Sequence, residues 1–226
     1  MSDDYYINLS EYPLNKFKEE LMESELLPSR QILKEDLKDR FKILKENGIS
    51  NLAELMSLIK TTKKAKDFSL KSGLPEKYVL ILRREVSSYQ PRPVNLDKFP
   101  GVNEETVRKL QDAKIKTTVN LFERIKTPED RKKLTVEFDI NPDELLTLTK
   151  LTDLSRVKWV GPIFARIFLD SNTDTVDKLS KAEVKPLYEN LIEINQEKNY
   201  TKSHFIETDV QLCVNFARKL PKVIKY

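Results

Sequence analysis

Apolar residues recur along this chain at the three- and four-residue spacing of amphipathic α-helices, and short polar stretches separate the runs. A first stripe follows Pro13. A second begins at Ser29, a good N-cap residue, and stops at the C-cap signature Asn47-Gly48. It predicts one helix, whose apolar members are Ile32, Leu33, Leu37, Phe41 and Leu44. The pattern predicts an all-α protein.

The apolar pattern returns after 66 residues, because the run 48–60 can be laid over the run 114–126 without a gap. The aligned apolar pairs are Ile49 and Ile115, Leu55 and Leu121, Ile59 and Ile125, Phe68 and Leu134, Leu74 and Ile140, and Leu82 and Leu148. A looser third copy begins at Trp159-Val160-Gly161, with Asn172 at the place of Gly48. Chance similarity between two amphipathic stretches is the alternative to a repeated packing unit.

The stretch from Leu96 to Leu110 is central to the interpretation. A short apolar run reaches the turn Pro100-Gly101, and a new amphipathic helix starts within two residues, with Val107 and Leu110 on one face. This arrangement resembles the hairpin of a helix-hairpin-helix motif, in which a glycine-containing turn joins two short helices.

The repeat order, together with the segments 154–165 and 190–198, is similar to an uncharacterised prokaryotic family of tandem helix-hairpin-helix proteins, a domain of unknown function. The likeness is strongest over residues 96–220. It implies an all-α fold of tandem helix-hairpin-helix repeats in an elongated multi-helix array, and nucleic-acid association by analogy with better-known hairpin modules. It implies no catalytic residues.

The proline-containing stretch 87–95 predicts a linker between two parts of the chain. Residues 1–90 would form an N-terminal helical module with a degenerate first repeat. Residues 96–226 would form the tandem helix-hairpin-helix domain, with repeats at about 96–155 and 156–226.

Charge is uneven along the chain, although the formal net charge is only +4. Residues 26–95 hold fifteen Lys or Arg and eight acidic residues, whereas residues 1–25 are acidic. A nucleic-acid surface is therefore expected as a patch in the first half. One cysteine, Cys213, and no leader or long apolar run predict a cytoplasmic protein without a membrane segment.

The first hairpin is a candidate phosphate site, because a glycine-containing turn exposes backbone N–H groups at a helix N-terminus. Its predicted donors are Gly101, Val102 and Asn103, with Arg108 and Lys109 one turn later. Asn103 replaces the usual second glycine, and Glu104 and Glu105 would repel a phosphate. The alternative is a purely structural turn, in which these carboxylates complement the helix dipole.

Two further groups of basic residues are candidates. At the second hairpin, expected at Gly161, the side chains of Arg156, Lys158 and Arg166 could touch a nucleic-acid backbone at the rim, while Trp159 and its apolar neighbours are expected mainly in the core. The strongest electrostatic feature is a cluster expected in a loop between helices, formed by Lys60, Lys63, Lys64 and Lys66. A solvated face is the alternative for this cluster.

Catalytic chemistry is weakly supported. His204 and Cys213 are the only residues of their types, so they cannot build a thiol and imidazole metal cluster. The sequence contains no nucleotide-binding glycine loop and no nucleophile elbow, and a carboxylate-and-Mg²⁺ nuclease is the remaining enzyme alternative. We therefore expect a non-enzyme without a cofactor. It would bind nucleic-acid backbone, most plausibly double-stranded DNA, without sequence preference, or act as a protein-interaction scaffold.

Overall fold

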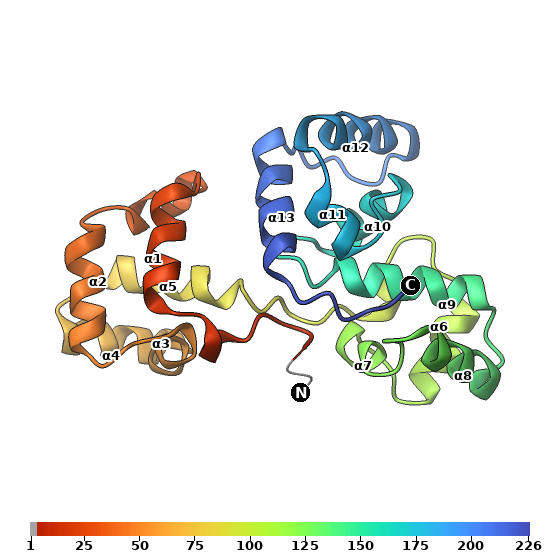
Figure 1. Cartoon of the computed structure of the whole chain (residues 1–226), viewed down its shortest axis with the longest axis horizontal. Helices are drawn as coiled ribbons and strands as arrows, with labels where there is room; N and C mark the ends of the chain where they lie inside the picture. Colours follow the sequence, from red (N-terminus) through yellow and green to blue (C-terminus); the bar gives the residue numbers. More distant parts are fainter. Residues whose placement is uncertain (1–3) are drawn as a thin grey trace. The chain divides into compact units, whose positions relative to one another are not determined.

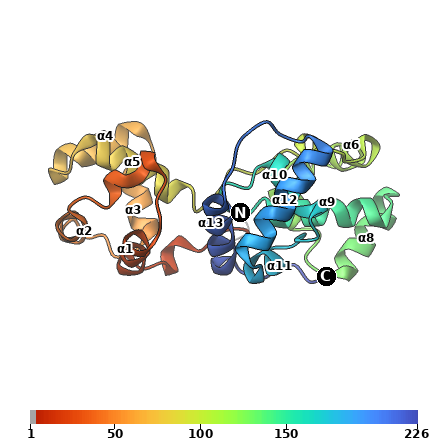
Figure 2. The same ribbon diagram turned by 90° about the horizontal axis from the view of Figure 1, so that it is seen from above.

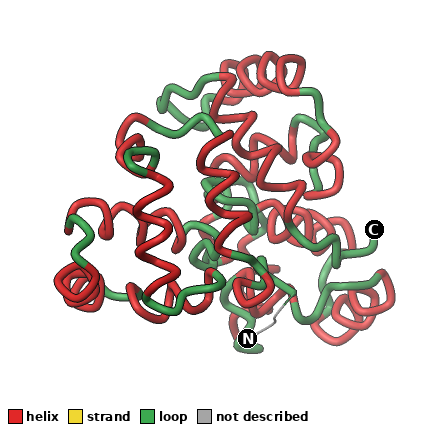
Figure 3. Tube along the Cα trace, turned by 60° about the vertical axis from the view of Figure 1, so that its left-hand side comes forward, coloured by secondary structure: helices red, strands yellow, loops and turns green. Residues whose placement is uncertain are grey.

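The computed structural model describes residues 4–226 and consists of helices joined by loops (Figure 3). Within these residues, extended pairing is limited to two isolated bridges, Pro13 with Asn51 and Asn95 with Thr117. The predicted all-α class is confirmed.

The chain divides into two compact units. The N-terminal unit spans Ile7–Gln90, and the C-terminal unit joins Pro91–Tyr226 to the segment that ends at Tyr6. The predicted linker over 87–95 is wrong at its start, because Tyr89 is buried and packs edge-on against Tyr12, with ring centroids 5.5 Å apart. An aromatic ring that finds a core contact is removed from water even in a sequence rich in proline and serine.

Two short 3₁₀ helices and five α-helices build the N-terminal unit (Figure 1). In chain order they are η1 (Leu9–Glu11), α1 (Leu14–Glu23), η2 (Pro28–Leu33), α2 (Leu37–Glu46), α3 (Leu52–Ile59), α4 (Thr62–Ser72) and α5 (Glu76–Ser87). Helices α3, α4 and α5 pack against one another (Figure 2). The core they share includes Leu55, Ala65, Val79 and Leu82, all fully buried.

The single helix predicted from Ser29 to Asn47 is wrong. The chain forms η2, turns at Asp36 with φ of +46°, and only then begins α2. The buried side chain of Arg40 holds this corner, because its Nη1 donates to the carbonyl of Ile32 at 3.0 Å and its guanidinium lies 4.5 Å from the Tyr78 ring centroid. Apolar spacing alone cannot reveal such a corner, since the stripe continues through it.

The C-terminal unit contains a short 3₁₀ helix and eight α-helices: η3 (Leu96–Lys98), α6 (Glu104–Asp112), α7 (Thr118–Phe122), α8 (Pro128–Phe138), α9 (Pro142–Leu154), α10 (Pro162–Asp170), α11 (Val176–Lys181), α12 (Val184–Lys198) and α13 (Glu207–Lys219). Helix α9 is central, since α7, α8 and α10 all pack against it. Its residues Leu145, Leu148, Leu151 and Leu154 are fully or almost fully buried. Helices α11 and α13 lie side by side (Figure 1).

Left-handed turns recur with the sequence repeat. Positive φ angles within residues 4–226 fall three to each set of four helices: Asp36, Gly48 and Gly73 in α2–α5; Gly101, Lys114 and Asp139 in α6–α9; and Trp159, Asn172 and Asn199 in α10–α13. The first two sets also share the predicted offset of 66 residues at the N-caps Thr61 and Thr127, and at the turns Gly48 and Lys114. Equivalent positions in these sets can therefore be compared directly.

Candidate functional site

The basic cluster lies on a helix and its immediate approach, not in the predicted loop. Lys60 is the C-cap of α3, and Lys63, Lys64 and Lys66 belong to α4. The hydroxyl of Thr61 accepts a hydrogen bond from the Lys64 backbone N–H at 3.2 Å, which fixes the start of α4. Two residues between α3 and α4 are thus enough to turn the chain, so four lysines project from one helical corner.

The first turn of α4 carries lysines and no acidic residue. Within residues 4–226, Lys60 and Lys63 form no ion pair, and both are exposed. Lys66 pairs with Glu76 at 3.1 Å, and the Lys64 ammonium donates to the Ser57 carbonyl at 3.1 Å. Cations at this end of a helix oppose the macrodipole, so the local field is strongly positive.

Helix α8 is the equivalent helix in the second set, and it shows the opposite pattern. Glu129 and Asp130 occupy the positions of Lys63 and Lys64. Thr127 and Asp130 form a reciprocal capping box, with both hydrogen bonds 3.1 Å long. Hydrogen bonds from Thr127 lower the pKa of the Asp130 carboxyl. The same backbone plan therefore accommodates acids in one copy and lysines in the other.

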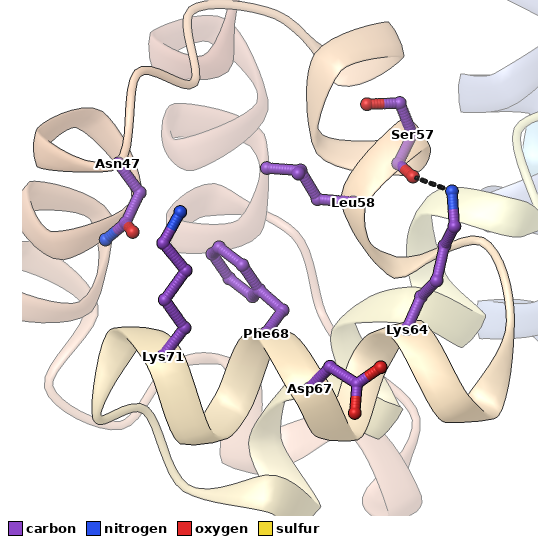
Figure 4. Close-up of a pocket in the computed structure, with 7 residues that line it drawn as sticks. All are labelled: Asn47, Ser57, Leu58, Lys64, Asp67, Phe68 and Lys71. Atoms are coloured by element: carbon purple, nitrogen blue, oxygen red, sulfur yellow. Dashed lines mark hydrogen bonds between the residues drawn. The ribbon is translucent and has the colours of Figure 1, made fainter.

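A pocket of about 260 Å³ adjoins the basic corner (Figure 4). Lys64 and Lys71 of α4 stand on either side of Phe68, and Leu58 of α3 faces them across the pocket. Phe68 is buried, so little of its ring is available for stacking on a base. The pocket suits an anionic group between two ammonium groups better than it suits a flat aromatic ligand.

The first hairpin has free backbone donors. Gly101 adopts φ of +68°, and the N–H groups of Gly101, Val102 and Asn103 have no hydrogen-bond acceptor in the described part of the chain. Asn103 is the N-cap of α6, and its Oδ1 accepts from the backbone N–H of Glu105 at 2.9 Å and of Thr106 at 3.0 Å. The turn donors remain available, whereas those of the first helical turn are already satisfied.

Carboxylates surround the first hairpin more closely than the sequence suggested. Besides Glu104 and Glu105, the side chain of Glu144 accepts a hydrogen bond from Asn103 Nδ2 at 2.9 Å and another from the Thr106 hydroxyl. A phosphate at this turn would meet all three carboxylates, and their repulsion opposes its binding.

The basic residues assigned to the first hairpin separate. Lys109 is engaged by Glu105 at 3.3 Å and by the Asp139 carbonyl at 2.5 Å, whereas Arg108 is exposed and forms no ion pair within residues 4–226. Arg166, expected at the second hairpin, lines a cavity of about 470 Å³ at the first, together with Gly101, Val102 and Asn103. There it pairs with Asp170 at 3.0 Å, so its charge is largely compensated.

The second hairpin turns at Trp159, not at the predicted Gly161. Trp159 adopts φ of +69°, while Gly161 is extended and serves as the N-cap of α10. The N–H groups of Val160 and Gly161 already donate within the turn, at 3.0 and 3.2 Å. Trp159 is 39 % exposed and Ile163 is 37 % exposed, so the expectation that they belong to the core is wrong. Their positions at the turn and on the outer side of α10 keep them at the surface.

Arg156 and Lys158 do not lie at a nucleic-acid rim. Arg156 is fully buried and Lys158 is 4 % exposed. The Arg156 guanidinium donates to Asp153 Oδ1 at 2.6 Å and to the Pro221 carbonyl at 2.7 Å. Asp153 lies three residues earlier on the same helical path, which is the signal in the sequence that could have indicated an internal partner.

Two negative findings concern residues 4–226. No group of three or more His, Cys, Asp or Glu side chains is arranged to hold a metal ion in that part of the chain. None of its helices combines the length and the apolar character that crossing a bilayer requires.

Comparison with known proteins places the chain in a family. No curated protein and no solved structure matches it. A family model described as "Domain of unknown function (DUF4332)" matches residues 100–220, which lie in the C-terminal unit. Since the match covers more than half of the 226 residues, this protein belongs to the family of the domain of unknown function DUF4332.

Proposed function

We propose that this protein binds the phosphate backbone of nucleic acid, with double-stranded DNA as the first candidate, and that it does so without catalysis. The basic corner at the start of α4 is the main contact. One observation carries the proposal: Lys63 and Lys64 occupy the first turn of α4, where the equivalent helix α8 has Glu129 and Asp130.

Lysines at a helix N-terminus are unfavourable for the free protein. Each one near the positive end of the dipole costs about 0.3–1 kcal/mol. A bound phosphate reverses this balance, because it is attracted by the ammonium groups and by the helix end together. The arrangement is therefore better suited to a protein with an anionic partner than to one without.

We interpret the recurring left-handed turns as tandem helix-hairpin-helix repeats. In this interpretation the free N–H groups of Gly101, Val102 and Asn103, with the exposed Arg108, supply a secondary contact. Glu144 and its neighbours weaken that contact. Donors to phosphate read no base edges, so we expect little preference for sequence.

The test is fluorescence anisotropy with a short labelled duplex at two or more salt concentrations. The logarithm of the association constant should fall linearly with the logarithm of salt, with a slope of about −0.9 for each neutralised phosphate. Lys63→Glu with Lys64→Glu should lower affinity at least tenfold and make the slope shallower. The matched control is Lys132→Glu with Lys133→Glu, which changes the net charge equally on the exposed face of α8. Absence of binding at low salt, or an equal loss in both double variants, contradicts the proposal.

A protein-interaction scaffold is the alternative function, and the exposure of Trp159 and Ile163 beside the second hairpin favours it. Trp159 is the only tryptophan of the chain, so its fluorescence reports directly on that hairpin. If a protein partner changes this emission while a duplex does not bind, the scaffold function is preferred.

A further inference from the structure

We infer that the outer face of α4 on one molecule docks onto the outer face of α8 on a second copy of the chain, with Leu70 against Val136. This inference goes beyond nucleic-acid binding and does not depend on it.

The two side chains are the most exposed large apolar residues in the described part of the chain. Leu70 is 86 % exposed and Val136 is 78 % exposed. They are 66 residues apart, so they occupy the same position of α4 and α8, two residues before the helix C-terminus. An apolar side chain that recurs at one solvent-facing position indicates a contact surface more strongly than a single exposed leucine does.

Charges around the two positions have opposite signs. Helix α4 carries charged residues at Lys63, Lys64, Lys66, Asp67 and Lys71. The equivalent residues of α8 are Glu129, Asp130, Lys132, Lys133 and Glu137. Four of these five pairs are opposite in sign, and only the pair of Lys66 and Lys132 is alike. With the two helices parallel and in the same register, the Leu70 to Val136 contact is flanked by attractive pairs.

The charge pattern identifies a second copy as the occupant. One repeated partner could not complement both faces, because the charges that attract it to α4 would repel it from α8. The two faces do complement each other. The charged residues involved are exposed except Asp130, which is half-buried. Glu137 also pairs with Arg124 at 2.8 Å, so an incoming lysine would share that carboxylate.

The contact is expected to be weak and asymmetric. One helix face against another buries less area than a standard stable interface of about 1,600 Å². Each molecule presents α4 to one neighbour and α8 to another, so the association is heterologous and can continue beyond a dimer.

Sedimentation equilibrium of the full chain, without nucleic acid, tests the inference. The weight-average mass of the wild type should rise above the monomer mass of 26.4 kDa as the protein concentration increases. Leu70→Glu and Val136→Glu should each reduce association at least tenfold. An equimolar mixture of the two variants keeps one intact pair of faces, so it should form a 1:1 dimer and nothing larger. A wild type that stays monomeric at every concentration, or variants that associate as the wild type does, overturns the inference.

A cross-linking pair gives an independent readout if a glutamate variant folds poorly. Leu70→Cys and Val136→Cys chains, mixed under mild oxidation, should form a heterodimeric disulfide faster than either chain forms a homodimer. The native Cys213 is buried and does not compete. Equal rates for all three disulfides would contradict the proposed register.

Discussion

The Nη1 atom of Arg156 lies 2.6 Å from Oδ1 of Asp153, in an ion pair buried in the C-terminal unit. Arg156 also donates to the carbonyl of Tyr5 at 3.0 Å and to that of Pro221 at 2.7 Å. The second oxygen of Asp153 accepts from the backbone N–H of Val176 at 2.9 Å. The pair therefore fastens both ends of the chain to the start of α11.

Removing one member of this pair should be costly. Arg156→Met leaves the Asp153 carboxylate buried without its cation, and we expect a loss of about 3–5 kcal/mol in the free energy of unfolding. Urea denaturation measures the loss. The control is Arg124→Met, which breaks the exposed pair with Glu137 and should cost at most about 1 kcal/mol. Similar losses in both variants would contradict the structural role of Arg156.

Acidic residues borrowed from α8 should stabilise α4. In the double variant Lys63→Glu with Lys64→Asp, two cations at the positive end of the helix are replaced by anions, and the introduced aspartate can complete a capping box with Thr61. We expect a gain of about 0.5–2 kcal/mol in the free energy of unfolding. Thermal and urea unfolding at low salt measure it. A loss of stability would show that these lysines serve the fold, which removes the reason for assigning them to a ligand.

Left-handed turns should respond oppositely to glycine in the two copies. Gly48 has φ of +80°, and a Cβ atom built there meets nothing within 4 Å, so Gly48→Ala should cost only backbone strain, about 1 kcal/mol. Lys114 has φ of +66° at the equivalent turn, so Lys114→Gly should gain about 0.5–1 kcal/mol. Chemical denaturation of the two variants checks the signs. The same sign in both would mean that the two turns are not equivalent.

Alkaline pH should reveal the burial of Cys213. Burial raises the pKa of this thiol to about 12, from an ordinary value of 9.0. Because the folded pKa is the higher one, this contribution to stability is complete below about pH 9 and is lost as the pH rises toward 12. Unfolding measured from about pH 8 to 11 should show a smaller decline for Cys213→Ala than for the wild type. The remaining decline, which the tyrosines share, is common to both. Identical pH profiles would contradict this assignment.

Thiol labelling offers a second check on the same residue. At about pH 8 the buried thiol should react with iodoacetamide only as fast as the protein opens, and urea should accelerate the reaction. Rapid labelling of the folded protein would show that Cys213 is accessible.

Helix identity and the repeat were predictable because they depend on local chemistry. The spacing of apolar residues, the caps at Asn51, Thr117 and Thr175, and the turns at Gly48 and Asn172 are all encoded within a few residues. Such local signals need no knowledge of distant contacts. The prediction therefore failed where a distant contact decides, as at the corner between η2 and α2, which Arg40 holds against Tyr78.

The candidate site divides in the same way. The sequence alone determined an all-α chain with a basic first half and residues suited to bind phosphate, because composition and periodicity carry that information. Tertiary structure decided which of those charges are available: it buried Arg156, paired Lys109 and Arg166, and left Lys60 and Lys63 exposed without an ion pair in residues 4–226. The reason is physical, since the use of a charged side chain depends on its burial and its neighbours, and distant parts of the chain supply both.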